Sequence, residues 1–138
     1  MDETVRLSIS LDESLFERLD RLVQDHGYSN RSEFVRDMIR DKLVEKEWEE
    51  NRDVVGTITL VYNHHARKLS EKLTSLQHSH HDSILATTHV HLDEHMCAEM
   101  ILVKGKGSMV KKISDMLRRQ KGILHATLSM STLGSEIH

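Results

Sequence analysis

The chain has 138 residues, 38% of them hydrophobic and 30% charged, and a formal net charge of −3. This length holds one medium domain or two small ones and excludes solenoids and multidomain enzymes. No apolar run reaches the roughly 20 residues needed to cross a bilayer, and the start does not resemble a signal peptide. We therefore expect a cytoplasmic protein with no membrane partner. Only two Phe, two Tyr and one Trp are available, and so thin a core favours stabilisation by oligomerisation or by a metal.

Charge and histidine are unevenly distributed along the chain. Residues 1–50 carry 8 Lys+Arg and 14 Asp+Glu, net −6, whereas the rest of the chain has net +3. Eight of the 11 histidines lie between His64 and His95, and neutral imidazole is a common ligand of transition metals. The single cysteine, Cys97, has no partner for an intrachain disulfide. This uneven distribution predicts two functional halves, residues 1–50 and 51–138.

The first half predicts a strand followed by two helices. Residues 5–11 alternate between apolar and polar side chains, a pattern typical of a strand with one buried face. Asp12 is the expected N-cap of a helix that ends at Gly27, and a second helix begins at Asn30 with Glu33 as its reciprocal capping partner. The two helices carry apolar stripes at helical spacing: Leu15, Phe16, Leu19, Leu22 and Val23 in the first, and Phe34, Val35, Met38, Ile39 and Leu43 in the second. The acidic run 44–53 is interpreted as the helix end and a linker.

The predicted strand has no partner within the first half, so we expect it to pair with a second copy of the chain. The result is a two-stranded antiparallel ribbon that folds only as a dimer. Such a ribbon fits the DNA major groove. Its exposed face presents Arg6, Ser8 and Ser10, and the start of the second helix offers a phosphate site at Asn30, Arg31 and Ser32. The net charge of −6 counts against DNA binding, so affinity must come from a few well-placed arginines or from elsewhere in the chain.

The second half predicts a βαββαβ order, the split-βαβ layout. Its expected elements are strands at 54–63, 84–92, 96–103 and 123–130, and helices at 65–77 and 108–120. The whole chain is therefore expected to be α+β, with a βαα domain followed by a ferredoxin-like domain.

The central hairpin of the second half concentrates metal-ligating residue types. His89 and His91 are two positions apart on a strand, so both imidazoles leave the same face about 6.6 to 6.8 Å apart. Cys97 begins the returning strand, where a tight turn brings it alongside them. A fourth ligand is available among His78, His80 and His81, while His64, His65 and His95 are surface groups or weaker secondary sites. One thiolate with several imidazoles suits Zn, Ni or Cu.

Two resemblances follow from these motifs. The strand–helix–helix pattern, with Gly-Tyr-Ser-Asn-Arg-Ser-Glu at 27–33, resembles the ribbon-helix-helix repressors over about residues 4–46. With the added runs Gln-His-Ser-His-His-Asp at 77–82, Ala-Thr-Thr-His-Val-His at 86–91 and then Cys97, nearly the whole chain resembles the NikR family of nickel-responsive regulators. That resemblance implies an ACT-like second domain forming a central homotetramer, a dimer of dimers, and a palindromic operator as partner.

The resemblance also implies roles for individual residues. One Ni(II) per chain is held in a square plane by His89, His91 and Cys97 of one chain and His78 of a neighbour, with Glu99 nearby. Glu33 and Asp37 help to form a cation site between the two domains when DNA is bound. The DNA contacts it implies are Arg6, Ser8 and Ser10 at bases, Arg31 and Ser32 at phosphates, and Arg67 at the DNA backbone. Two departures are Ser79, which interrupts the histidine run, and Ser in place of Thr at positions 8 and 10.

The expected function is repression of nickel-uptake genes, with nickel promoting operator binding. Two alternatives remain open: a zinc- or copper-responsive regulator on the same scaffold, and a metal storage or delivery protein. An enzyme with a small-molecule substrate is not expected, because a Cys flanked by histidines at ligand spacing is better explained by coordination, and the sequence offers no carboxylate pair or phosphate loop.

Overall fold

The computed structural model describes residues 2–138 and divides the chain into two compact units. The first unit ends at Arg40, and the second runs from Asp41 to His138. Residue 1, where the first predicted domain begins, lies outside the described residues. In the described part of the chain, no helix combines the length and apolar character needed to span a bilayer.

The predicted strand at residues 5–11 is not formed in the single chain. The segment before α1 is assigned to no regular element, and its apolar side chains are open to solvent, with Val5 86%, Leu7 78% and Ile9 62% exposed. A strand exists only through hydrogen bonds to a neighbouring strand, and within residues 2–138 no segment pairs with these residues. Residues 5–11 therefore need a second copy of the chain in order to form the strand that their alternating side chains predict.

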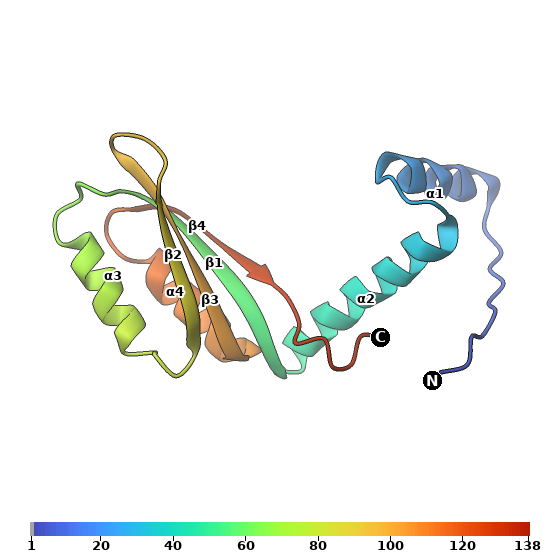
Figure 1. Cartoon of the computed structure of the whole chain (residues 1–138). Helices are drawn as coiled ribbons and strands as arrows, with labels where there is room; N and C mark the ends of the chain where they lie inside the picture. The colour runs from blue at the N-terminus through green and yellow to red at the C-terminus, as the bar shows by residue number, and fades with distance from the viewer. Residues whose placement is uncertain (1) are drawn as a thin grey trace. The chain divides into compact units, whose positions relative to one another are not determined.

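Two helices, α1 (Glu13–Asp25) and α2 (Arg31–Glu49), follow this segment (Figure 1). α1 begins after Asp12, as expected. Asn30 accepts a hydrogen bond on Oδ1 from the backbone N–H of Glu33 at 2.9 Å, which is the capping bond predicted for the second helix. Phe34 is buried, and the ring of Tyr28 meets it edge-on with centroids 5.3 Å apart.

The segment 44–53, predicted to hold the helix end and a linker, is helical over most of its length. α2 continues to Glu49, and Trp48 is only 4% exposed because its ring joins the core of the second unit. The indole Nε1–H donates to the carbonyl oxygen of Ser131 at 2.9 Å. The polar residues around Trp48 therefore form the solvated face of a helix, and that helix buries one aromatic side chain.

The second unit has the predicted βαββαβ order. Its elements are β1 (Asp53–Asn63), α3 (Leu69–His78), β2 (Ile84–His91), β3 (Met96–Lys106), α4 (Gly107–Arg118) and β4 (Ile123–Met130). The strands form one antiparallel sheet in the order β2-β3-β1-β4. The α+β fold class and the ferredoxin-like layout are confirmed.

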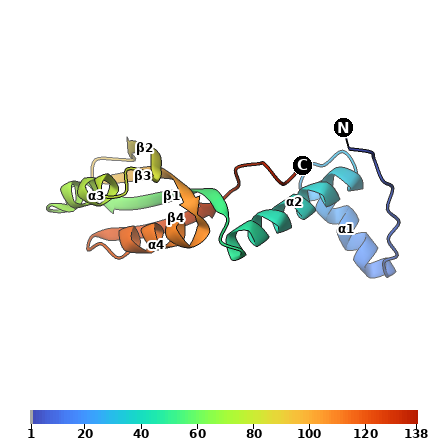
Figure 2. The same cartoon turned by 90° about the horizontal axis from the view of Figure 1, so that it is seen from below.

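Both helices of the second unit cover the same face of its sheet (Figure 1). Alternate residues of β1 from Val54 to Tyr62 are buried, and they share one core cluster with Leu73 of α3 and Val110 and Leu117 of α4. Figure 2 shows α4 running along β4, while α3 lies toward the β2 edge. The core therefore lies between one sheet face and two helices, and in the described part of the chain the other face of the sheet carries no helix of this unit.

The boundaries of two predicted elements differ from those in the structure. α3 begins at Leu69 and not at residue 65, because residues 64–68 form turns and Lys68 has a positive φ of 64°. β3 extends to Lys106 and leads directly into α4, so Gly105 and Lys106 belong to the strand and not to a loop.

Candidate metal centre

Three of the four predicted nickel ligands lie on one face of the β2–β3 hairpin. His91 is opposite Cys97 in the antiparallel register, and His89 is opposite Glu99. Opposed residues of antiparallel strands share a face, which here is the face that the helices cover. The rings of His89 and His91 have centroids 5.3 Å apart. The hairpin thus gathers two imidazoles and one thiol, as the two-residue spacing and the turn predicted.

The Cys97 thiol is fully buried between β2 and β1. Its Sγ lies 3.5 Å from the carbonyl oxygen of Tyr62, to which it donates a weak hydrogen bond. Burial is the main cause that raises the pKa of the Cys97 thiol. Hydrogen bonding by the Tyr62 side chain, as distinct from its carbonyl, lowers this pKa, and the nearby Glu99 carboxylate raises it. The metal-free cysteine is therefore held as a neutral thiol, and a metal that takes its sulfur must displace a proton.

Gln77 and Glu99 connect α3 to the hairpin beside these ligands. The side-chain amide of Gln77 donates to Oε2 of Glu99 at 3.2 Å and accepts from the hydroxyl of Thr87 at 3.0 Å. Burial raises the pKa of Glu99, although the hydrogen bond from Gln77 and the charge of His89 lower it. Glu99 was expected near the site. Gln77 was not predicted as a site residue, and its position directly before His78 was the only signal in the sequence.

Tyr62 is a second neighbour of the hairpin site that the sequence reasoning missed. It lies opposite Cys97 in β1 and is 1% exposed. Its ring meets that of His89 edge-on, with centroids 6.1 Å apart. Its even position in a strand whose even residues are buried was the available signal. Tyr62 therefore lies beside both His89 and Cys97.

His78 is not brought to the hairpin ligands within this chain. It is the last residue of α3, and its ring lies 6.0 Å from that of His81. His80 is held by a 3.0 Å contact between its Nδ1 and the carbonyl of Leu76, and Nε2 of His81 lies 3.0 Å from a carboxylate oxygen of Asp82. Across residues 2–138, no three or more His, Cys, Asp or Glu side chains are arranged to hold a metal ion.

The remaining histidines of the cluster lie around the hairpin turn. The ring of His64 is 5.0 Å from that of His91 and 4.0 Å from that of His65, and His65 is 5.5 Å from His95. Nε2 of His64 lies 2.7 Å from the carbonyl oxygen of Glu94. These imidazoles continue the row that begins at His89 and His91.

The predicted DNA-contacting residues of the first unit differ in their surroundings. Arg6, Ser8 and Ser10 are exposed. Arg31 forms a two-pronged ion pair with Asp20, with N–O distances of 2.7 and 3.1 Å, and its guanidinium stacks over the ring of Phe16 at 4.5 Å. The other predicted contacts are exposed: Asn30, Ser32 and Arg67.

The two carboxylates of the predicted cation site are close in sequence but have different partners. Oδ2 of Asp37 accepts a 2.7 Å hydrogen bond from the hydroxyl of Tyr28, and Oδ1 pairs with Arg40 at 3.0 Å. The Tyr28 hydroxyl is the main cause that lowers the pKa of Asp37. Glu33 is exposed in the first turn of α2.

Comparison with known proteins agrees with both halves of the chain. Residues 5–46 match the ribbon-helix-helix protein family of the copG type, and residues 55–131 match the NikR C-terminal nickel-binding domain. Relatives named as nickel-responsive regulators are 55% identical in Geobacter metallireducens and 52% identical in Geobacter sulfurreducens, each over 100% of both chains. A solved structure of an uncharacterized protein from Thermotoga maritima is 16% identical, with a TM-score of 0.52 over 57% of this chain and 98% of that one, which shows the fold alone. The chain therefore belongs to the NikR family of nickel-responsive, DNA-binding transcriptional regulators, which are not enzymes.

Proposed function

We propose that this protein represses nickel-uptake genes in the cytoplasm and that Ni(II), bound between chains of a homotetramer, promotes binding to a palindromic operator. The observation that carries the proposal is the division of the ligand set. His89, His91 and Cys97 share one face of a hairpin, while His78 ends a different element and faces His81. A neighbouring chain that supplies His78 completes the set, with one Ni(II) per chain.

The chemistry of this donor set suits nickel. Imidazole nitrogen and thiolate sulfur are ligands that Ni, Zn and Cu accept, whereas Mg and Ca prefer oxygen. In its bound form the metal supplies a fixed link between two chains. Gln77 holds the end of α3 against Thr87 and Glu99 through its two hydrogen bonds, so His78 is carried on a segment already tied to the hairpin.

The first unit supports dimerisation and DNA contact. Its exposed apolar side chains, which an isolated soluble unit would bury, are Val5, Leu7, Ile9, Leu11, Leu15, Phe16, Leu22, Met38 and Ile39. A second copy that pairs with residues 5–11 covers them and leaves Arg6, Ser8 and Ser10 on the outer face of the ribbon. In this proposal, residues 1–50 form the DNA-binding domain and residues 51–138 form the nickel-binding and tetramerisation domain.

The remaining predicted residues act at the DNA or between the domains. Asn30, Ser32 and Arg67 contact the DNA backbone through the exposed positions they occupy. Arg31 reaches a phosphate only after exchanging its Asp20 partner for it. Glu33 and Asp37 contribute carboxylate oxygens to a second cation site in the DNA-bound state. Residues 77–88 become ordered when the metal site is complete. This order favours the arrangement in which both DNA-binding dimers of the tetramer reach the operator, and it can do so because nickel binds that arrangement more tightly than the others.

The test is operator binding by the full chain with and without one equivalent of Ni(II). The operator is first recovered by selection from random duplexes in the presence of the protein and Ni(II). We expect tight binding only with nickel, and loss of the nickel response in Cys97→Ala. The matched control is His125→Ala, which removes an exposed imidazole from β4 and should leave the response unchanged.

Equal operator affinity with and without nickel contradicts the proposal. An equal or larger response to Zn(II) or Cu(II) favours a regulator of those metals on the same scaffold. Nickel binding without any selected operator favours storage or delivery.

A further inference from the structure

The segment that follows β4 passes beside the last turn of α2, and both belong to the second unit (Figure 1, Figure 2). The backbone N–H of Ser131 donates to the carbonyl oxygen of Val55 at 2.9 Å, which continues the pairing of β4 with β1. The carbonyl oxygen of Ser131 accepts the indole N–H of Trp48 at 2.9 Å. We define residues 131–136 as the strap, because they leave the sheet and contact the end of α2.

Thr132 makes the central contact of the strap. Its hydroxyl donates to the carboxylate of Glu47, whose two oxygens both lie at 3.1 Å. The same hydroxyl accepts the backbone N–H of Gly134 at 3.0 Å, and Gly134 has a positive φ of 84°, a conformation that favours glycine. The chain bends there, and Glu136 then forms an ion pair with Arg52 in the connection from α2 to β1.

The start of α4 holds the chain at the same end of α2. Oδ1 of Asn51 accepts the backbone N–H of Ser108 at 2.9 Å, and the carbonyl oxygen of Arg52 accepts that of Gly107 at 3.1 Å. These bonds satisfy two of the backbone donors that the first turn of a helix leaves free. The end of α2 is therefore tied to the second unit by α4 as well as by the strap.

The contacts of the strap differ in strength. The side chains of Arg52 and Glu136 are 49% and 61% exposed, and an ion pair between exposed side chains contributes little to stability. Thr132 and Glu47 are half-buried, and a hydrogen bond to a charged acceptor is stronger than one between neutral groups. Removal of the Thr132 hydroxyl is therefore the most selective way to release the strap.

α2 is the covalent connection between the two domains, since it begins in the first unit and ends in the second. We propose that Thr132 and Glu47 are positioning residues for operator binding. They keep the end of α2 seated on the second unit, so that the connection between the domains is ordered before DNA binds. The inference rests on the proposed function, because it concerns the same operator.

An ordered connection matters when both DNA-binding dimers of one tetramer must bind the same operator. Only some arrangements of the two dimers fit both half-sites, and a connection that is already ordered loses less conformational entropy when such an arrangement is adopted. A scrambled duplex that is bound by one dimer makes no such demand. We therefore expect the strap to act on the ratio of operator to scrambled affinity and not on DNA affinity in general.

The test compares variants of the full-length nickel-loaded protein at the Thr132–Glu47 contact. Thr132→Val removes the hydroxyl and keeps the shape of the side chain. Glu47→Met removes the acceptor, whereas Glu47→Gln removes the charge but keeps an oxygen that can accept the hydrogen bond. The matched control Thr127→Val makes the same exchange at an exposed position of β4.

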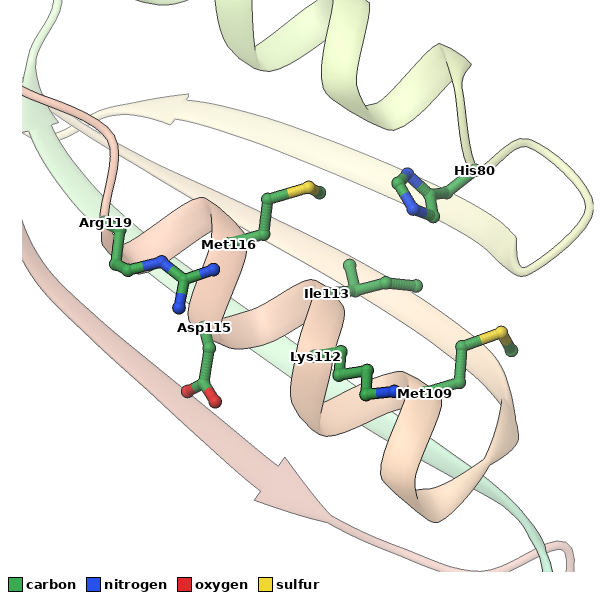
Figure 3. Close-up of a pocket in the computed structure, with 7 residues that line it drawn as sticks. All are labelled: His80, Met109, Lys112, Ile113, Asp115, Met116 and Arg119. Atoms are coloured by element: carbon green, nitrogen blue, oxygen red, sulfur yellow. The ribbon is translucent and has the colours of Figure 1, made fainter.

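A second control, Ile113→Val, separates the strap from general stability. Ile113 is a buried residue of α4 that points into an open hollow beside His80 (Figure 3). The described residues that line this hollow include none of the strap. Shortening a buried Ile to Val costs about as much stability as the loss of one hydrogen bond, so this variant weakens the second unit without changing the contact under test.

Two measurements follow the end of α2 and its effect on DNA binding. Hydrogen exchange of the amides in residues 44–52 is measured by mass spectrometry, and the affinities for operator and scrambled duplex are measured by fluorescence anisotropy. Loss of one net hydrogen bond shifts an equilibrium by about fivefold, so exchange in Thr132→Val should be about fivefold faster. The ratio of operator to scrambled affinity should fall by about two- to fivefold, because fewer molecules hold α2 in its seat.

The variants should fall into two groups. Thr132→Val and Glu47→Met should lower the ratio by the same factor alone and together, since both remove one contact. Glu47→Gln, Thr127→Val and Ile113→Val should keep the wild-type ratio. Nickel affinity without DNA should be unchanged in all of them, because none of these residues is a proposed ligand.

A wild-type ratio in Thr132→Val overturns the inference and leaves the strap as a structural contact. An equal fall of the ratio in Ile113→Val also overturns it, because general loss of stability then explains the effect. Additive losses in the double variant overturn it as well, since the two side chains then act separately. If the wild type binds both duplexes equally with or without nickel, the proposed function fails and the positioning role fails with it. Faster exchange in Thr132→Val then still shows that the strap holds α2.

Discussion

Truncation of Trp48 is the sharpest test of how α2 is anchored in the second unit. The indole is 4% exposed, and its Nε1–H donates to the carbonyl of Ser131 at 2.9 Å. Two glycines make room for the ring: a Cβ added at Gly56 would lie 3.1 Å from its Cη2 atom, and one at Gly107 would lie 3.3 Å from Cε3. The ring thus fills a site that the backbone is shaped to receive.

The expected loss of stability follows from that burial. Aromatic side chains bury about 150–250 Å², worth about 4–6 kcal/mol at 25 cal/mol per Å², and measured losses for truncation of large aromatics are about 3–5 kcal/mol. We expect Trp48→Ala to lower the free energy of unfolding by about 4 kcal/mol. Trp48→Phe keeps most of the apolar contact and loses the hydrogen bond, so we expect a loss of about 2 kcal/mol.

Urea unfolding followed by far-ultraviolet circular dichroism measures both losses. All variants must be compared without nickel and at one protein concentration, since ligand binding and association shift apparent stability. A loss below about 1 kcal/mol in Trp48→Ala, or equal losses in the two variants, would refute this account of α2.

Three further predictions concern single side chains. Tyr28→Phe should raise the pKa of Asp37 toward its ordinary value, because the hydroxyl is the main group holding it low; an unchanged carboxyl titration by NMR would contradict this. Glu99→Gln should make the nickel-free protein more stable than wild type at pH 7 but not at pH 4, by urea unfolding. The raised pKa of Glu99 means that the folded state holds the proton more tightly than the unfolded state does, so ionisation of Glu99 destabilises the fold as pH rises. If the variant is less stable than the wild type at pH 7, or equally stable, burial does not raise the pKa of Glu99. Gly56→Ala should lower the free energy of unfolding by about 1–3 kcal/mol, because the added Cβ lies 3.0 to 3.1 Å from three side chains. An unchanged melting temperature in thermal unfolding would contradict this, because it would show that those side chains move aside at no cost.

The periodic elements of the second unit were predictable because each has one buried face. The β-rich composition of residues 54–63 identified β1, and the 3.6-residue spacing of Ile113 and Leu117 identified α4, both of which lie in the core. The acidic stretch around Trp48 was misread because a helix that buries one residue in its last turn has almost no periodic signal. Charge density there indicated solvent exposure correctly, but it could not indicate where the helix ends.

Only the part of the candidate site that lies on the β2–β3 hairpin was predictable from the sequence. The positions of His89 and His91 follow from the two-residue period of a strand, and that of Cys97 follows from the hairpin register. Gln77 and Tyr62 reach the site from other elements, so their contacts depend on tertiary packing. The pairing of Arg31 with Asp20 likewise joins α2 to α1 across eleven residues, which no pattern in either helix reveals.

Complementation between two inactive variants tests most directly whether nickel is held between chains and thereby drives operator binding. His78→Ala and Cys97→Ala are each expected to abolish the nickel-dependent operator complex. Unfolded together and refolded as mixed assemblies, they should regain nickel binding at about one quarter of the sites on statistical mixing, together with nickel-dependent operator binding. Recovery arises because one chain keeps His78 and its neighbour keeps His89, His91 and Cys97. If His78 and Cys97 serve the same chain, the mixture regains neither nickel binding nor the operator complex. If either residue is not a ligand, its single variant keeps nickel binding on its own. Either result contradicts the account.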